Sequence, residues 1–127
     1  MNYTKDDFPS PSWIIDLLVE SAQIQGGEIC LEPSSGIGNL ALSLAQKGAI
    51  VNCIEPNPYY QLQLVKKGLR VIGSDFLTTS NILNQFDLVV MNPPFSEQIS
   101  HLKRAFDCLK LEGKLVALIS NTPWQYN

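Results

Sequence analysis

The fold is decided by the stretch from Glu28 to Lys47, EICLEPSSGIGNLALSLAQK. Its first five residues are largely apolar and predict a buried strand. A turn with two glycines follows, Pro33–Gly38, and the next residues predict a helix from about Asn39 to Lys47, which Gly48 ends. A strand that enters a helix through a glycine-bearing turn begins a strand–helix–strand unit, which favours a parallel sheet.

The rest of the chain repeats this alternation. Four further strands are predicted, at Ile50–Ile54, Arg70–Gly73, Phe86–Met91 and Lys114–Ser120. Between them we expect a helix from about Tyr60 to Lys67, a helix from about Gln98 to Leu109, and a turn at Glu112–Gly113. Five strands that alternate with helices indicate an α/β fold with a doubly wound parallel sheet and right-handed crossovers.

One more helix is predicted before the first strand. Ser10 is placed to cap it, Pro11 to occupy its first position, and Gly26-Gly27 to end it. The expected buried face consists of apolar residues at helical spacing, namely Trp13, Ile14, Leu17, Leu18 and Ala22.

The composition is that of one globular domain. The 127 residues are 45% hydrophobic and 17% charged, with no apolar run of the roughly 18 residues that span a membrane. The amino terminus has no signal-peptide pattern, so a cytoplasmic location is expected. A net charge of -3 argues against a standalone nucleic-acid binder. Two basic clusters, Lys66, Lys67 and Arg70, and Lys103, Arg104 and Lys110, are typical of solvated surface.

Cysteine and histidine usage gives no sign of a metal site or of a disulfide framework. The three cysteines, Cys30, Cys53 and Cys108, are odd in number, and the first two lie in apolar runs typical of core strands. His101 is the only histidine of the sequence, and no cluster of ligands accompanies it. We therefore expect free core thiols and no metal.

Polar residues follow four of the predicted strands where each strand ends. They are Glu32, Glu55, Asp75 and Asn92. In an open α/β sheet, ligands bind outside the carboxyl ends of the strands. Gly36 and Gly38 allow a ligand to approach the backbone closely, and Glu55 follows Gly38 by 17 residues, near the ~20 expected for an acid that binds ribose hydroxyls.

The fourth of these strands leads into a turn, Asn92-Pro93-Pro94-Phe95, hereafter the NPPF turn. Its prolines stiffen the backbone and remove two donors, which leaves carbonyls free to accept hydrogen bonds. An amide oxygen beside such a carbonyl can hold an amino group, and Phe95 offers a face for stacking. A plain proline turn with Phe95 in the core is the structural alternative.

A dinucleotide site is a second reading of the glycine turn. Gly36-Ile37-Gly38-Asn39-Leu40-Ala41 satisfies the G-x-G-x-x-A pattern of NAD-dependent oxidoreductases. Three features count against it: Glu32 immediately before the turn, Asp75 as a second acid, and the NPPF turn, for which hydride transfer has no use.

Together these residues resemble the class I S-adenosylmethionine-dependent methyltransferases, and within them the amino-group methyltransferases typified by adenine-specific DNA methyltransferases. The resemblance runs from Phe8 to Ser120. Leu31–Leu40 is similar to the family's cofactor loop, the NPPF turn to its (D/N/S)-P-P-(Y/F/W) catalytic motif, and Phe8–Pro11 to the segment that closes over the methionine end of the cofactor. The resemblance implies a Rossmann-like sheet of order 3-2-1-4-5.

The resemblance also implies S-adenosylmethionine as cofactor. Glu55 would bind the ribose, and Asp75 and the Phe76 backbone would bind the adenine. The expected cofactor-binding set is Pro11, Glu32, Ser34, Gly36, Gly38, Asn39, Glu55, Asp75, Phe76 and Asn92. The expected catalytic set is Asn92, Pro93, Pro94 and Phe95.

The expected mechanism depends on the substrate amine that is methylated. The Asn92 side-chain oxygen and the Pro93 carbonyl would accept its two protons and relieve the positive charge that grows during attack. Phe95 would stack on the target base, which must leave a duplex to reach it. The expected substrate is adenine in DNA; the alternatives are guanine or adenine in RNA, and a protein glutamine.

Length raises a second hypothesis. Members of this family carry strands after the fifth, so residues 1–127 are expected to be one carboxyl-terminally truncated methyltransferase domain without the sixth and seventh strands or a target-recognition region. Lys114–Ser120 would then lie at the sheet edge, covered by Trp124 and Tyr126, by a second copy, or by a partner chain. The alternative is a non-catalytic unit that binds the cofactor or assembles with another polypeptide.

Overall fold

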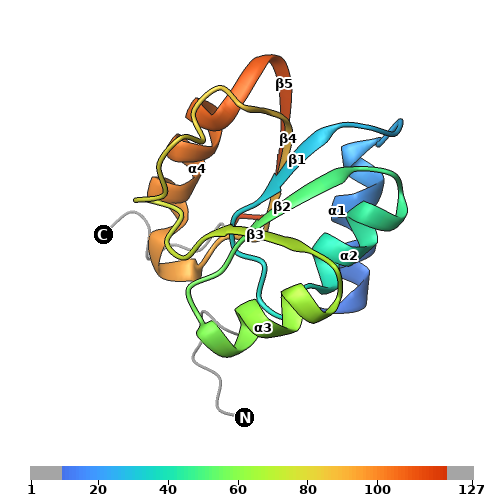
Figure 1. The fold of residues 1–127 in the computed structure, drawn as a ribbon. Coiled ribbons are helices and arrows are strands. Elements are labelled where there is room, and N and C mark those ends of the chain that lie inside the picture. The colour runs from blue at the N-terminus through green and yellow to red at the C-terminus, as the bar shows by residue number, and fades with distance from the viewer. Residues whose placement is uncertain (1–9, 120–127) are drawn as a thin grey trace.

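The computed structural model describes residues 10–119, which form a five-stranded parallel sheet of order β3-β2-β1-β4-β5 (Figure 1). The strands are β1 Ile29–Glu32, β2 Ile50–Ile54, β3 Arg70–Gly73, β4 Phe86–Met91 and β5 Leu109–Ala117. The predicted α/β class, strand order and bounds of β2, β3 and β4 are confirmed. All five strands point the same way, so the residues that follow them meet at one edge of the sheet.

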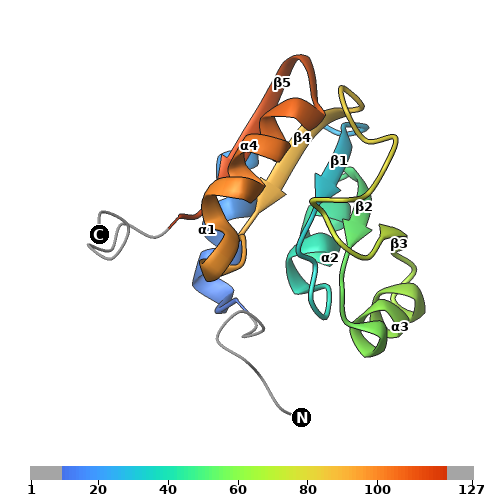
Figure 2. The ribbon, with the colours of Figure 1, turned by 90° about the vertical axis from the view of Figure 1, so that its left-hand side faces the viewer.

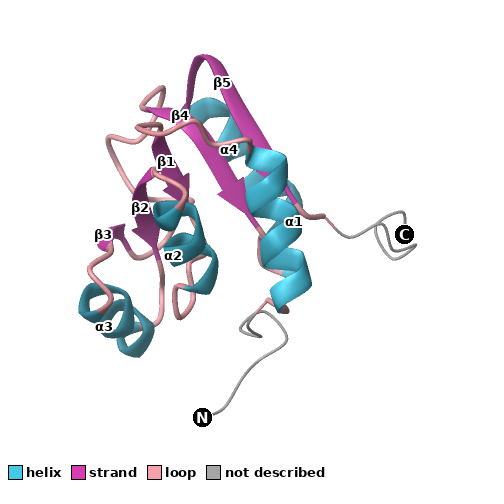
Figure 3. Cartoon of the chain, turned by 90° about the vertical axis from the view of Figure 1, so that its right-hand side faces the viewer, coloured by secondary structure: helices cyan, strands magenta, loops and turns pink. Residues whose placement is uncertain are grey.

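Helices cover both faces of the sheet. They are α1 Ser12–Ala22, α2 Asn39–Gln46, α3 Pro58–Lys66 and α4 Gln98–Cys108, the last preceded by a short 3₁₀ helix, η1 Phe95–Glu97. Figure 2 looks onto the face that α4 covers, and Figure 3 onto the opposite face, with α1 and α2. None of these helices has both the length and the apolar character that crossing a membrane requires.

Two apolar cores, one on each face, explain why the strands are apolar throughout. Along β4, Leu88 and Val90 pack with α1, α2 and α3, while Val89 and Met91 pack with α4. All four side chains are at most 2% exposed. Alternate residues of a strand point to opposite faces, so a strand covered on both sides reads as a continuous apolar run.

The start, the end and the face of α1 differ from the prediction. The helix ends at Ala22, before Gly26-Gly27, and Gln23 after it has a left-handed φ of 50°. The helix begins at Ser12, Pro11 holds the capping position, and no side chain caps it. Ser10 instead bonds a residue of the NPPF turn. The buried residues of α1 are Ile15, Leu18, Val19 and Ala22. Trp13 and Leu17 are 64% and 48% exposed, because the helix meets α2, β4 and β5 along a face rotated away from them.

The start of α3 shows a cap that the sequence reading overlooked. Asn57 accepts hydrogen bonds from the amides of Tyr59 and Tyr60, and Pro58 occupies the first turn. The helix therefore begins two residues before the predicted Tyr60.

The fifth strand is also longer than predicted. It begins at Leu109 and absorbs the expected turn as an irregularity, since Phe86 pairs with Leu109 but Leu88 pairs with Lys114. Glu112 has a φ of 68°, and a Cβ on Gly113 would lie 2.9 Å from the Lys110 carbonyl oxygen. β5 is an edge of the sheet, as expected. Trp124 and Tyr126 lie outside the described residues.

Candidate active site

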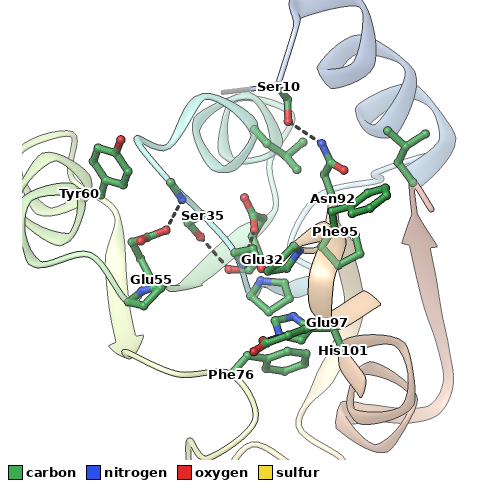
Figure 4. A pocket seen from close by; sticks show the side chains of 18 of the residues that line it. Ser10, Glu32, Ser35, Glu55, Tyr60, Phe76, Asn92, Phe95, Glu97 and His101 are labelled. Carbon is green, nitrogen blue, oxygen red and sulfur yellow. Dashed lines mark hydrogen bonds and ion pairs between the residues drawn. The ribbon is translucent and has the colours of Figure 1, made fainter. Parts of the chain in front are cut away.

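A cavity of about 630 Å³ opens at the carboxyl ends of the strands (Figure 4). This volume lies within the range of small-molecule sites. All thirteen candidate residues line it: Pro11, Glu32, Ser34, Gly36, Gly38, Asn39, Glu55, Asp75, Phe76, Asn92, Pro93, Pro94 and Phe95. The sequence predicted Glu32, Glu55, Asp75 and Asn92 at four strand ends, and the fold brings these four to one cavity with the other nine. Their individual roles remain predictions.

The glycine turn, Pro33–Gly38, forms one wall and is held from both sides. The Ser35 hydroxyl donates to the Glu32 carbonyl at 2.7 Å, and the Ser35 amide donates to the Ile54 carbonyl at 3.0 Å. Gly38 has a φ of 96°, and a Cβ there would lie 2.8 Å from the Leu64 side chain. Only glycine suits both the conformation and the space.

Glu55 closes the second wall and is 5% exposed. One carboxylate oxygen accepts from the Gly36 amide at 2.6 Å, and the other accepts from the Asn57 amide at 2.8 Å. These charge-assisted bonds tie the end of β2 to the glycine turn.

Glu32, at the end of β1, is 2% exposed and has a weaker set of partners. Its side chain accepts one backbone hydrogen bond, from the Ser34 amide at 2.9 Å. The pKa of Glu32 is raised to about 8, mainly by burial and also by the nearby Glu55 charge, while the hydrogen bonds of Ser34 and Ser35 oppose the rise. A cationic group in the cavity would favour the ionised carboxylate.

The segment after β3 turns at Asp75. One Asp75 carboxylate oxygen accepts from the Leu77 amide at 3.1 Å, which makes a local turn. The Phe76 side chain is 2% exposed and lies edge-on to the His101 ring, with ring centroids 5.2 Å apart. The backbone of Asp75 and Phe76 is thereby fixed at the rim of the cavity.

Asn92 faces the cavity opposite Glu55 in Figure 4, with Glu32 between them. The side-chain nitrogen of Asn92 donates to the Ser10 hydroxyl at 2.8 Å. In this orientation the amide oxygen is the acceptor left for a ligand. Phe95, at the start of η1, is 37% exposed, so it is no core residue. The structural alternative of a plain proline turn with a buried Phe95 is therefore wrong.

Several residues that the sequence reading did not nominate also line the cavity. They are Ser10, Ser35, Tyr60, Glu97, Gln98 and His101, with others of the flanking loops. The His101 ring nitrogen Nε2 lies 3.0 Å from a Glu97 carboxylate oxygen, and His101 is 4% exposed. Glu97 and His101 are one helical turn apart just after the NPPF turn. Their closeness to that turn is the feature of the sequence that could have predicted them at the cavity.

The cavity is acidic. Four carboxyl groups line it, from Glu32, Glu55, Asp75 and Glu97, and its described lining includes no lysine or arginine. Such a lining favours a cationic or neutral ligand rich in hydroxyl and amino groups, and opposes a phosphate-rich one.

Sequence comparisons give partial relatives. No protein-family model matches the chain. The probable ribosomal RNA small subunit methyltransferase A of Methanosphaera stadtmanae is 33% identical over 106 residues, which cover 74% of this chain and 38% of that protein. The dimethyladenosine transferase of Saccharomyces cerevisiae is 29% identical over 86 residues, which cover 61% and 26%. The chain thus spans less than two fifths of these curated relatives.

Solved structures with the same fold are methyltransferases in several cases. A candidate RNA methyltransferase from Pyrococcus horikoshii matches with a TM-score of 0.77 and 21% identity, over 93% of this chain and 65% of the other. Coclaurine N-methyltransferase, bound to N-methylheliamine and SAH, matches with a TM-score of 0.66 and 20% identity, over 91% and 39%. The chain therefore has the fold of the class I S-adenosylmethionine-dependent methyltransferases.

Proposed function

We propose that this chain, as one methyltransferase domain over residues 1–127, binds S-adenosylmethionine and methylates the exocyclic amino group of adenine in RNA. The observation that carries the proposal is the orientation of Asn92. Its amide nitrogen donates to Ser10, so its oxygen is left to accept a hydrogen bond from the N–H of an amine in the acidic cavity.

The donors and acceptors of the cavity fit this cofactor. In this proposal Glu55 would accept hydrogen bonds from the ribose hydroxyls, and the Asp75 and Phe76 backbone would bind the edge of the adenine. The methionine end would lie against Glu32, Ser34, the two glycines, Asn39 and Pro11. The cofactor carries a sulfonium and an ammonium group, and an acidic lining without lysine or arginine suits both charges.

The residues of the NPPF turn would act on the amine. An exocyclic amine on an aromatic ring is a poor nucleophile, because its lone pair is delocalised. The Asn92 oxygen and the Pro93 carbonyl would accept its two hydrogens and stabilise the positive charge that grows on nitrogen. The cofactor supplies the electrophilic methyl group, and the chain holds the amine in line with it. Phe95 is exposed enough to stack on the base.

The relatives change the preferred nucleic acid. DNA adenine was the expectation from the motif, with RNA as the alternative. The relatives at 33% and 29% identity carry names that refer to ribosomal RNA methylation and to dimethyladenosine. Both names support RNA adenine over DNA, and we adopt RNA. Three free, buried cysteines among the described residues support the cytoplasm as the location.

The cavity argues against the dinucleotide reading of the glycine turn. An NAD pyrophosphate would bring two negative charges close to the buried carboxylate of Glu55. With no lysine or arginine in the described lining, nothing there offsets that repulsion.

One observation also supports a second function, a non-catalytic unit that binds the cofactor. The chain spans 38% and 26% of its two compared relatives, and β5 is a sheet edge. A unit that binds the cofactor and needs another polypeptide for methyl transfer would also have these features.

A labelled-methyl assay tests the proposal. The 127-residue chain is incubated with methyl-labelled cofactor and with separate pools of structured RNA, single-stranded DNA, duplex DNA and protein. Label in the RNA pool, recovered as methylated adenosine, is the expected result. Label only in the DNA pools would contradict the RNA proposal and support adenine in DNA, the substrate expected from the sequence. Cofactor binding without label in any pool would favour the non-catalytic unit.

A further inference from the structure

Arg104, on the second turn of α4, has an unusual set of partners for a surface-type side chain. It is half-buried, and its Nε donates to the Phe76 carbonyl at 2.7 Å. A terminal guanidinium nitrogen donates to the Thr79 carbonyl. Within residues 10–119 it forms no ion pair with a carboxylate. The sequence reading assigned Arg104 to a solvated basic cluster, and the structure shows instead a guanidinium that binds one loop twice.

That loop, Ser74–Thr79, is also held by its own backbone and by α3, where the Gln61 side chain donates to the Ser74 hydroxyl at 3.2 Å. The Asp75 carbonyl accepts from the Thr78 amide, the Thr79 amide at 2.9 Å and the Thr79 hydroxyl at 2.6 Å. A Cβ on Gly73 would lie 2.3 Å from that hydroxyl oxygen, so the loop packs directly against the end of β3. Arg104 supplies the hydrogen bonds from α4 to this loop.

These contacts fix the position of two polar groups at the cavity, the Phe76 amide and the Asp75 carboxylate. Arg104 fixes the Phe76 carbonyl, and His101 packs against the Phe76 ring (Figure 4). The Phe76 amide nitrogen has no hydrogen-bond acceptor among residues 10–119. Beside it, one Asp75 carboxylate oxygen bonds Leu77 and the other has no partner in the described chain. The loop therefore presents a backbone donor next to a carboxylate acceptor.

This donor–acceptor pair is complementary to adenine and not to hypoxanthine. Adenine offers an amino donor beside a ring-nitrogen acceptor. Hypoxanthine offers a carbonyl oxygen beside a ring N–H, which inverts both hydrogen bonds. The Phe76 N–H belongs to the Asp75–Phe76 peptide plane, which meets the plane of the carbonyl that Arg104 holds at the Phe76 Cα. A small rotation of the first plane would weaken the match, because hydrogen bonds lose strength steeply away from linear geometry.

We propose that Arg104 is a positioning residue that holds the Asp75–Phe76 pair in register and so sets the preference of the site for an adenine-bearing cofactor. The proposal rests on the proposed function, since it concerns the same cofactor. It adds a determinant that touches no ligand and acts through the loop.

The test compares two ligands on the 127-residue chain. S-adenosylhomocysteine and S-inosylhomocysteine, which differ only in the base, are titrated by calorimetry into the wild type, Arg104→Ala, Arg104→Lys and Lys103→Ala. Lys103 is the exposed neighbour on the same helix and serves as the control. Circular dichroism confirms the fold of each variant.

The wild type is expected to prefer the adenine ligand. Arg104→Ala should reduce this preference by about tenfold, mainly through weaker binding of S-adenosylhomocysteine, because the loop loses two fixed carbonyls. Arg104→Lys supplies a single ammonium group in place of the planar guanidinium, so its preference for the adenine ligand should lie between those of the wild type and Arg104→Ala. If Arg104→Ala does not fold, the role of Arg104 is tested by comparing the ligand preference of Arg104→Lys with that of Lys103→Ala.

The outcomes separate the two proposals. An unchanged preference in Arg104→Ala and Arg104→Lys overturns the role of Arg104, while the proposed function stands. An equal loss of affinity for both ligands has the same meaning, since a purely structural defect would act in that way. Absence of S-adenosylhomocysteine binding by the wild type overturns the proposed function and the role of Arg104 with it.

Discussion

The cavity has two halves that are held very differently. The half formed by the ends of β1, β2 and β3 is held by hydrogen bonds to backbone groups: the Glu55 carboxylate bridges the amides of Gly36 and Asn57, and the carbonyls of the Ser74–Thr79 loop accept from within the loop and from Arg104. The half formed by β4 and η1 depends on side chains. Asn92 is oriented by one bond to Ser10, and Phe95 is 37% exposed.

This difference separates binding from chemistry. Groups fixed by backbone bonds are organised before a ligand arrives, which lowers the entropy lost on binding. In the proposed function, groups on the β4 side would act on the charge that develops during methyl transfer. Changes in the first half should therefore weaken cofactor binding or stability, and changes in the second half should lower turnover.

Asn92→Ala should have the largest effect. Loss of the amide oxygen removes an acceptor for the reacting amine, and one such electrostatic contact is worth about 10²- to 10³-fold in rate. The methyl-transfer rate and the affinity for S-adenosylhomocysteine are measured on the same preparation. We expect the rate to fall and the affinity to change little.

Asn92→Asp is the matched control, because it keeps an oxygen and the length of the side chain. It should retain more activity than Asn92→Ala. A fall in cofactor affinity as large as the fall in rate would contradict the separation of the two halves.

Glu32 should make stability depend on pH. Burial raises its pKa from 4.5 to about 8. The folded protein then keeps a proton that the unfolded chain has already released above about pH 4.5, so the free energy of unfolding falls as the pH rises toward 8. Between pH 6 and pH 8 the loss should be about 2 kcal/mol, measured by urea denaturation.

Glu32→Gln should remove that loss, because the amide cannot ionise and keeps an oxygen for the Ser34 amide. Glu20→Gln, at an exposed position of α1, should retain the wild-type dependence. Identical pH profiles for the wild type and Glu32→Gln would show that the Glu32 carboxyl is not held protonated.

Gly38→Ala tests how tightly the first half is packed. The new Cβ would have to adopt a φ of 96° and lie 2.8 Å from Leu64. We expect a loss of about 1 to 2 kcal/mol in the free energy of unfolding and weaker cofactor binding. Gly68→Ala has a φ of 80° with nothing within 4 Å, so it measures backbone strain alone. Equal losses in the two variants would mean that the Leu64 contact costs nothing.

Ser10→Ala should have the smallest effect. It removes one hydrogen bond to the Asn92 amide, worth about 1 kcal/mol, so transfer should slow by roughly fivefold with unchanged stability. Ser10→Thr, which keeps the hydroxyl, should restore the rate. A wild-type rate in Ser10→Ala would show that the Asn92 amide is oriented by other groups.

The sequence predicted the sheet well because its strands are buried on both faces. The apolar runs at Ile50–Ile54 and Phe86–Met91 have the bounds that the structure gives. All the strand-end residues could be grouped for the same reason, since parallel strands deliver them to one edge. The face of α1 could not be read, because Trp13 and Leu17 are apolar yet exposed, and the packing of neighbouring elements decides which face is buried.

The polar residues of α4 show the limit of pattern reading at the site. His101 and Arg104 read as ordinary polar positions of an amphipathic helix. Their significance comes from Phe76, a residue 25 to 28 positions away that only the tertiary fold brings to them. Ser10 is similar, because its partner Asn92 is 82 residues distant.

Calorimetric titration of the 127-residue chain with S-adenosylhomocysteine, and separately with NAD, tests the central claim most directly. The acidic cavity predicts saturable, micromolar binding of S-adenosylhomocysteine and no binding of NAD. Binding of NAD, or of neither ligand, would contradict the assignment of this cavity to a methyl-donor cofactor.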